Sequence, residues 1–284
     1  MPGDACATRV AELASGPVEY RLDRRNGPAA VVLLHGGHLR AGLPCGEEVF
    51  AAAGCTVLAP SRPGYGRTPV STGTSPAGFA GAVSELCAHL GIRRVDAVAG
   101  VSAGGPTAVA LAALHPALVR KVLLLSAVGP LPWPSPGTRL GARLLFAPAT
   151  EAYCWSGVGG LLRRAPDAGL RTMLRSLTTL PVREALAELS AQERSELVAL
   201  FCRMRSGRGF GNDLRAGPDL TSRVTQPALV VASRRDGSVP YAHATTLAAR
   251  LRGAQLWESP AGSHLVWCGA GREELAERIG AFLR

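Results

Sequence analysis

The stretch from Val95 to Pro116, VDAVAGVSAGGPTAVALAALHP, constrains the fold more than any other part of the chain. It begins with small and β-branched apolar residues, passes through three glycines around a single serine, Ser102, and ends in an alanine-rich segment. This order is typical of a buried strand that enters a helix through a tight turn. Residues 97–119 carry no charge, which we attribute to burial in a sheet because glycine and proline interrupt the run.

Comparable strand signals recur along the chain and alternate with helical segments. The helices are predicted at residues 77–90, 106–114 and 242–251, and the last segment, EELAERIGAFL, has the spacing of an amphipathic helix. Such alternation predicts an α/β fold with a mostly parallel central sheet flanked by helices. The expected strands are AAVVLLHGG (29–37), CTVLAPSRPG (55–64), VDAVAGVS (95–102), VRKVLLLSAV (119–128) and PALVVASRRD (227–236).

The alternation breaks between residues 129 and 226, where a proline-rich segment is followed by helix-like stretches around 139–146, 168–177 and 193–204. A chain of 284 residues fits one α/β core with an insertion better than two independent domains. We therefore expect a core domain, residues 1–128 and 227–284, and a helical cap, residues 129–226. Such a cap would close over the carboxyl edge of the sheet, where open α/β sheets bind ligands.

The formal charge of +10 does not by itself indicate a nucleic-acid partner, because all but one of the 31 basic residues are scattered arginines, as GC-rich coding produces. The densest cluster, Arg203 to Arg215, allows an anion-binding role, although a solvated loop is the commoner explanation. Seven cysteines without a C-x-x-C pair suggest neither a disulfide framework nor a zinc site. We expect a cytoplasmic monomer or homodimer that takes a small-molecule substrate, with no cofactor, metal or membrane association; the N-terminus lacks the apolar region of a secretory signal.

Gly100 to Gly104 matches the spacing G-x-S-x-G, and it lies between a predicted strand and a predicted helix, which is the context that this motif requires. A serine on such a turn adopts strained backbone angles, and glycine two residues to either side removes the steric collision. The alternative is a phosphate-binding turn, but the G-x-G-x-x-G and G-x-x-x-x-G-K-[ST] spacings are absent. The pattern favours Ser102 as a nucleophile.

A serine nucleophile requires a base, and His264 is the best placed of the six histidines. It follows the apolar run AQLWES and precedes the last helix, on a loop that would return to the carboxyl edge of the sheet. Asp236 is the only aspartate that ends a predicted core strand at that edge, although the turn chemistry of Asp-Gly is an alternative explanation. The chain order Ser102, Asp236, His264 predicts a nucleophile, acid and base for acyl transfer.

Acyl transfer also needs donors for the developing oxyanion, and backbone N–H groups at a helix N-terminus are suitable. We expect one from Ala103 and the other from Gly37 or His38, in the loop after the strand that ends in HGG. For His38 we leave open whether it faces the substrate or is an incidental loop residue. Aromatic residues of the insertion could line a pocket or form the insertion's own core; the candidates are Trp133, Tyr153, Trp155 and Phe210, together with His38.

Taken together, these motifs resemble the α/β-hydrolase superfamily over residues 17–284. The matched motifs, in chain order, are HGG, SRPGYGRT, GVSAGG, SRRDGSVP and GSH. The resemblance implies that Ser102 is the nucleophile, Asp236 the acid and His264 the base, and that the insertion is a helical cap. It also implies that SRPGYGRT, residues 61–68, is a structural turn that supports the oxyanion loop. Serine at the elbow is unlike dehalogenases and typical epoxide hydrolases of this fold, and HGGH differs from the HGGPG of proline iminopeptidase-like members.

The expected function is therefore hydrolysis of a small, partly apolar ester, lactone or thioester through an acyl-enzyme. Two other classes stay open at this point. The same residues can cleave a carbon–carbon bond, and the fold also hosts non-hydrolytic lyases or cyclases of secondary metabolism and ligand receptors. Labelling of Ser102 by a fluorophosphonate probe would separate an activated serine from a receptor.

Overall fold

One eight-stranded sheet forms the centre of the molecule in the computed structural model, which describes residues 6–25, 29–52, 54–215 and 217–284. The strand order is β1-β2-β4-β3-β5-β6-β7-β8; β2 pairs antiparallel with β1 and β4, and the other neighbours pair in parallel. The predicted α/β fold with a mostly parallel sheet is confirmed. The strands are β1 (Arg9–Leu13), β2 (Gly16–Asp23), β3 (Ala30–Leu34), β4 (Thr56–Pro60), β5 (Ala97–Val101), β6 (Val122–Leu125), β7 (Ala228–Ala232) and β8 (Gln255–Glu258).

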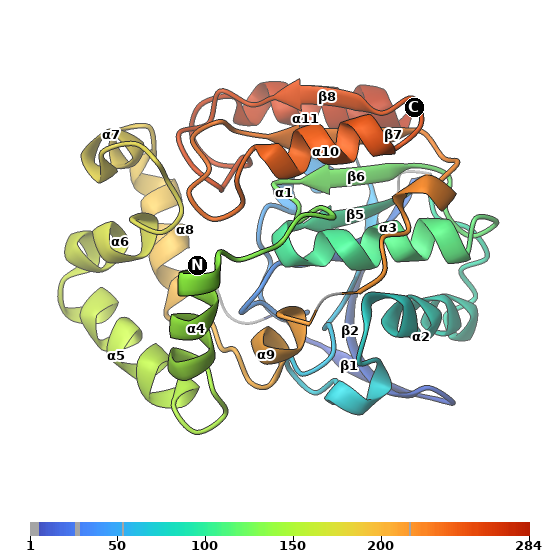
Figure 1. Cartoon of the computed structure of the whole chain (residues 1–284), viewed down its shortest axis with the longest axis horizontal. Coiled ribbons are helices and arrows are strands. Elements are labelled where there is room, and N and C mark those ends of the chain that lie inside the picture. The colour runs from blue at the N-terminus through green and yellow to red at the C-terminus, as the bar shows by residue number, and fades with distance from the viewer. Residues whose placement is uncertain (1–5, 26–28, 53, 216) are drawn as a thin grey trace.

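Helices cover both faces of this sheet (Figure 1). On one face lie α2 (Pro76–His89), α3 (Gly105–Leu114) and α10 (Ala242–Arg250), and on the other α1 (Glu48–Ala52) and α11 (Arg272–Leu283). Alternate residues of β3 belong to different hydrophobic clusters: Val32 packs with the first group of helices and Leu33 with the second. Burial on both faces explains why the central strands are continuously apolar in sequence.

The charge-free stretch of residues 97–119 contains a strand, a turn and a helix, as expected. Every residue of β5 is buried, residues 102–104 form a short 3-10 helix, and eight of the ten residues of α3 are buried. Among the described residues, no helix is both long and apolar enough to cross a lipid bilayer.

The chain between β6 and β7 forms a group of helices at one side of the sheet (Figure 1), and we call residues 129–226 the cap segment. Buried residues of these helices, such as Trp155, Leu170 and Phe201, belong to the same cluster as α1 and α11. The cap segment thus extends the core on that face. Its described helices are α4 (Pro136–Leu145), α5 (Glu151–Arg164), α6 (Pro166–Leu174), α7 (Val182–Ala187), α8 (Ala191–Phe201) and α9 (Gly209–Asp213), followed by the 3-10 helix η3 (Thr221–Arg223).

Candidate active site

Ser102 lies on the turn between β5 and α3, with φ of 51°, in the left-handed region that non-glycine residues rarely adopt. The glycines of the motif are required by close packing. A Cβ on Gly104 would lie 2.1 Å from the carbonyl oxygen of Leu34, and one on Gly100 would lie 2.7 Å from the Cβ of Ala108. The strained turn that the G-x-S-x-G pattern predicts is therefore present.

Three neighbouring strands direct their following loops toward Ser102. The strand β5 lies between β3 and β6, and the chain changes direction across the sheet at this point, which is where α/β sheets bind ligands. From the loop after β3, a Cβ on Gly36 would lie 3.1 Å from the Cβ of Ser102. From the loop after β6, the N–H of Val128 donates to the carbonyl oxygen of Ser102 at 2.9 Å. Ser102 is 8% exposed, so it is accessible only from a restricted direction.

Asp236 and His264 form a buried pair in which Nδ1 of His264 lies 2.6 Å from Oδ2 of Asp236. The other carboxylate oxygen, Oδ1, accepts hydrogen bonds from the backbone N–H groups of Ser238 and Val239, both at 2.8 Å. Because a carboxylate only accepts, Nδ1 of His264 carries the proton, and Nε2 keeps a lone pair. The structure thus brings together the predicted acid and base.

The backbone of His264 is fixed on both sides of the residue. Its N–H donates to the carbonyl oxygen of Leu177 in the cap segment at 2.7 Å. Its carbonyl oxygen accepts from Oγ of Ser126 at 2.8 Å, and Ser126 follows β6 with φ of 47°. Neither Leu177 nor Ser126 has a sequence signal for this role, because the role depends on contacts over 80 residues away in the chain.

The turn of residues 61–68 contacts the loop after β3, in agreement with the expected supporting role. Nε of Arg62 donates to the carbonyl oxygen of His35 at 2.7 Å. The guanidinium also pairs with Asp213 of the cap segment, and the Tyr65 hydroxyl donates to the same carboxylate at 2.7 Å. Burial alone would lower the pKa of Arg62, but the Asp213 carboxylate raises it above the usual value. The side chain of His35 is also held, because its Nε2 lies 2.7 Å from Oε1 of Glu47.

His38 belongs to a partly buried aromatic cluster. Its ring stacks on Phe210, with centroids 4.3 Å apart, and lies near Phe146 and Trp155. Nδ1 of His38 is 2.8 Å from Oγ of Ser206, which also accepts from the Trp155 indole. Burial, assisted by the positive charge of Arg62, lowers the pKa of His38 to about 3. His38 is therefore neutral at physiological pH and acts in this structure as a packing residue.

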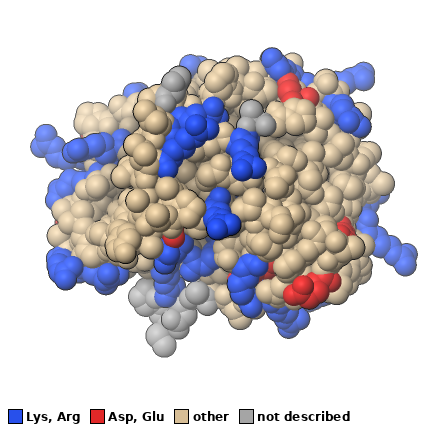
Figure 2. Space-filling model, turned by 60° about the horizontal axis from the view of Figure 1, so that its bottom comes forward, with Lys and Arg blue, Asp and Glu red and all other residues tan. Residues whose placement is uncertain are grey.

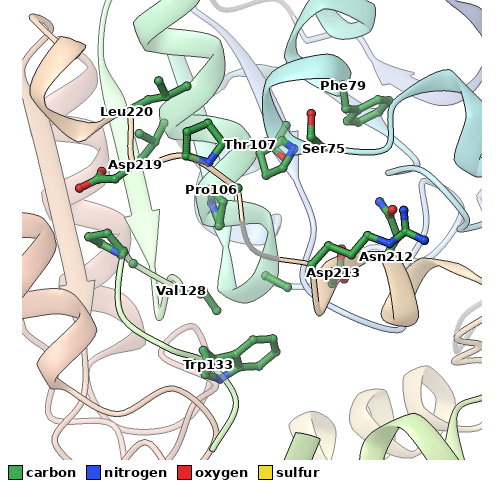
Figure 3. A pocket seen from close by; sticks show the side chains of 18 of the residues that line it. Ser75, Phe79, Pro106, Thr107, Val128, Trp133, Asn212, Asp213, Asp219 and Leu220 are labelled. Atoms are coloured by element: carbon green, nitrogen blue, oxygen red, sulfur yellow. The ribbon is translucent and has the colours of Figure 1, made fainter.

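A cavity of about 490 Å³ opens beside Ala103, the residue after Ser102 (Figure 3). It extends between the N-terminal ends of α2 and α3, the loop after β6 and the end of the cap segment. Its lining includes apolar side chains, such as Phe79, Val128, Trp133 and Leu220, and charged ones, such as Arg62, Arg139, Asp213 and Asp219.

Of the five candidate pocket residues, Trp133 lines this cavity, and its indole N–H donates to the carbonyl oxygen of Ser238 at 2.9 Å. Trp155 and Phe210 lie in the aromatic cluster with His38 and do not line it. The expectation for Tyr153 is wrong: its side chain is on the outer surface of α5 and 81% exposed, because the helix buries Trp155 on its inner side.

The predicted oxyanion donors belong to the Ser102 turn and to the loop after β3. Ala103 is one of the first residues of the 3-10 helix that leads into α3, where backbone N–H groups have no partner within the helix. Gly37 lies in the loop after β3, and a Cβ there would be 3.2 Å from the Phe210 ring. The aromatic cluster thus packs directly against this loop.

Comparisons with known proteins agree with the fold. Residues 31–278 match the model of the alpha/beta hydrolase family. The chain is 30% identical over 275 residues to the uncharacterized hydrolase YcgS of Bacillus subtilis (strain 168), covering 94% of this chain and 95% of the relative. The chain therefore belongs to the alpha/beta hydrolase family, and the family model and the relative both indicate a hydrolase.

Solved structures with low sequence identity share the whole fold. An alpha/beta hydrolase fold protein from Nakamurella multipartita superposes with a TM-score of 0.79 at 23% identity, covering 98% of this chain and 99% of that one. An esterase from Exiguobacterium antarcticum gives a TM-score of 0.66 at 16% identity, covering 96% and 98%. At these identities the likeness establishes the architecture alone.

Proposed function

We propose that the chain is a serine hydrolase that cleaves a small, partly apolar ester, lactone or thioester through an acyl-enzyme. One observation carries this proposal: the buried pair of His264 and Asp236, with Nδ1 to Oδ2 of 2.6 Å, lies at the sheet edge where Ser102 occupies a strained turn. An imidazole held by a carboxylate through Nδ1 presents Nε2 as a base, which is what a serine hydroxyl needs to become a nucleophile.

The proposed reaction has two halves. In the first, Oγ of Ser102 bonds to the substrate carbonyl carbon while its proton moves to Nε2 of His264. The tetrahedral intermediate collapses, the bond to the leaving oxygen or sulfur breaks, and His264 returns the proton to that atom. In the second half, water attacks the acyl-enzyme with His264 again as the base, and Ser102 is regenerated. Asp236 stabilises the imidazolium in both halves.

The oxyanion of each intermediate is assigned to the backbone N–H groups of Ala103 and Gly37. Both are carried by loops whose positions the packing fixes, since Arg62 holds the loop after β3 and Val128 holds the Ser102 turn. Fixed donors stabilise developing charge without a reorganisation cost during the reaction.

The proposed substrate size follows from the cavity beside Ala103. A volume of about 490 Å³ falls in the range of small-molecule sites, and its apolar lining residues, which include Val128, Trp133 and Leu220, offer contacts to an aliphatic or aromatic acyl group. An acyl group whose carbonyl oxygen contacts the N–H of Ala103 can extend along the cavity toward Leu220 (Figure 3). The structural likeness to an esterase is consistent with this substrate class.

We further propose that the chain has no nucleic-acid partner. Figure 2 shows Lys and Arg side chains dispersed over that face as separate groups, with uncharged surface between them. Nucleic-acid sites instead concentrate basic residues in a patch or stripe.

A fluorophosphonate probe tests the proposed function directly. The purified protein is incubated with the probe, digested and mapped by mass spectrometry, with Ser102→Ala as the matched control and a known serine hydrolase as the positive control. We expect a single labelled site at Ser102 that is absent in the variant. An unlabelled Ser102, under conditions in which the positive control reacts fully, would overturn the proposal.

A further inference from the structure

A short segment between α6 and α7 contacts the loop that carries Asp236. Thr178 and Asp236 form an antiparallel bridge, in which the N–H of Thr179 donates to the carbonyl oxygen of Arg235 at 2.9 Å. The N–H of Gly237 donates to the carbonyl oxygen of Leu177 at 3.2 Å. A Cβ on Gly237 would approach the Thr178 backbone to 2.7 Å, so the two loops are in direct contact.

The same segment also holds the loop of His264. The carbonyl oxygen of Leu177, which accepts from the acid loop, also accepts from the N–H of His264 at 2.7 Å. One carbonyl of the cap segment therefore binds the backbone of both loops whose side chains form the acid and base pair. This peptide group thus links the backbone of the Asp236 loop to that of His264.

The side chain of Thr178 fixes that peptide group in place. Its hydroxyl donates to the carbonyl oxygen of Gly262, two residues before His264, at 2.5 Å, and accepts from the N–H of Leu180 at 3.0 Å. Thr178 is 7% exposed, so water does not easily replace these contacts. The N–H of Gly262 donates in turn to Oε2 of Glu188 at 2.8 Å, and the cap segment thus binds the Gly262 residue through both of its backbone groups.

We propose that Thr178 is a positioning residue, which sets His264 against Asp236 by anchoring the base loop to the cap segment. The inference rests on the proposed function, because it assigns Thr178 a role only through the acid and base pair. In this proposal the reactivity of Ser102 depends on how the cap segment packs against the loops of Asp236 and His264. Thr178 acts through these loops and does not itself contact Ser102.

The test compares three variants with the wild-type chain. Thr178→Val removes the hydroxyl at nearly constant shape, Thr178→Ser keeps it, and Thr172→Val makes the same change on the exposed side of α6. Each is assayed for the rate of fluorophosphonate labelling at Ser102, for kcat and KM with p-nitrophenyl butyrate, and for Tm. All rates are measured well below the lowest Tm.

We expect Thr178→Val to lower the labelling rate and kcat about tenfold or more, since small misplacements of a catalytic group have effects of this size, while KM stays within about twofold. Thr178→Ser restores both rates, and Thr172→Val leaves them unchanged. If Thr178→Val does not fold, Glu188→Gln provides the second variant, because it weakens the other anchor of Gly262 from an exposed position; a labelling rate lowered about threefold is expected.

Three results would overturn the inference: wild-type labelling rates in a folded Thr178→Val protein, an equal loss in Thr178→Ser, or a fall in Tm without any change in the rates. A wild-type chain that is not labelled at Ser102 would instead refute the proposed function. The two failures are therefore distinguishable in one experiment.

Discussion

Arg62 and Asp213 form a buried ion pair between the turn after β4 and helix α9 of the cap segment, with Nη2 2.8 Å from Oδ2. Their side chains are 5% and 6% exposed. Because Arg62 also donates to the carbonyl oxygen of His35, the pair joins the end of the cap segment to the loop that carries Gly37. The cap segment is thus connected to the site at this point and, through Leu177, at the acid and base loops.

This pair predicts a large stability effect when one partner is removed. We expect Arg62→Leu to lower the free energy of unfolding by about 3–5 kcal/mol, since it leaves the Asp213 carboxylate buried without its cation. Adding Asp213→Leu should recover part of the loss. In the exposed pair of Arg234 and Glu258, the same Arg→Leu change should cost about 1 kcal/mol or less. Urea unfolding measures the free energy of unfolding of the three variants. Equal decreases in Arg62→Leu and Arg234→Leu would contradict the prediction.

The proposed roles predict how the three central side chains respond to substitution. Ser102→Ala and His264→Ala should each lower kcat by a factor of about 10⁴ or more, because the nucleophile and its base act as a unit. Asp236→Asn should retain partial activity at best, since an amide cannot hold the imidazole in the same tautomer as a carboxylate does. Near-native Tm values would show that the variants lose activity because a catalytic group is missing, and not because they unfold. Full activity in Asp236→Asn would assign the acid to another residue.

The sequence around Ser102 predicted the strand, the turn and the helix, because a strained turn of this kind requires glycine at fixed positions and therefore shows as a five-residue motif. Local patterns also placed Asp236 and His264 at one edge of the sheet, since the carboxyl ends of parallel strands lie together. The contacts of Leu177, Thr178 and Ser126 left no such signal. Each depends on hydrogen bonds between segments that are distant in sequence, and small polar or apolar residues occur in many other settings.

The cavity was the least predictable part. Aromatic residues in the insertion could face a cavity, a cluster or water, and composition does not distinguish these outcomes. Trp133 lines the cavity, Trp155 and Phe210 pack around His38, and Tyr153 is on the surface. The phase of each cap helix decides which side faces the core. On α5, Tyr153 and Trp155 are both aromatic and only two residues apart, so residue type alone does not show which of them faces inward.

The low pKa of His38 predicts a specific loss of stability in acid. Burial keeps the folded-state pKa at about 3, below its ordinary value of 6.5, so the unfolded chain binds a proton in this window that the folded chain does not. The free energy of unfolding therefore falls as pH drops from about 6.5 toward 3, by up to about 1.4 kcal/mol per pH unit. His38 has φ of 64°, a backbone angle that asparagine tolerates, so His38→Asn should fold and lose this dependence of stability on pH.

Urea unfolding of wild type and His38→Asn between about pH 5 and 7 isolates the contribution of His38, because the other titrating groups are common to both proteins. The variant should be less stable at neutral pH, where it lacks the ring contacts with Phe210 and Phe146, and its stability should depend less on pH. Parallel pH dependences in the two proteins would contradict the prediction.

The packing of Gly104 predicts that even one methyl group is too large there. Its Cβ would meet the Leu34 carbonyl at 2.1 Å, and this backbone cannot move without shifting the loop that carries Gly37. We expect Gly104→Ala to cost about 1–3 kcal/mol or more and to reduce the labelling of Ser102. Gly81→Ala on α2, where a Cβ has no neighbour within 4 Å, should instead raise the free energy of unfolding by about 0.5–1 kcal/mol. A neutral Gly104→Ala would show that the turn is not tightly packed.

The cavity beside Ala103 predicts how activity depends on acyl chain length. In the wild type, kcat/KM for p-nitrophenyl esters should rise by up to about fourfold per methylene, because each buried methylene contributes about 0.8 kcal/mol. Leu220 lies at the end of the cavity away from Trp133 (Figure 3), so Leu220→Trp should shorten the space available. The variant should hydrolyse the acetyl ester within about twofold of the wild-type rate, because an acetyl group does not fill the cavity, and should lose the gain for longer chains.

Leu256→Trp is the matched control, since Leu256 is on the edge strand β8, 38% exposed, and does not line the cavity. It should preserve the wild-type dependence on chain length, and comparable Tm values would exclude unfolding as the cause of any difference. If kcat/KM depended on acyl chain length in the same way in Leu220→Trp and in the wild type, the acyl group would have to extend elsewhere, toward the aromatic cluster around His38. A Phe210→Ala variant would then be expected to widen the range of acceptable chains, which the same ester series measures.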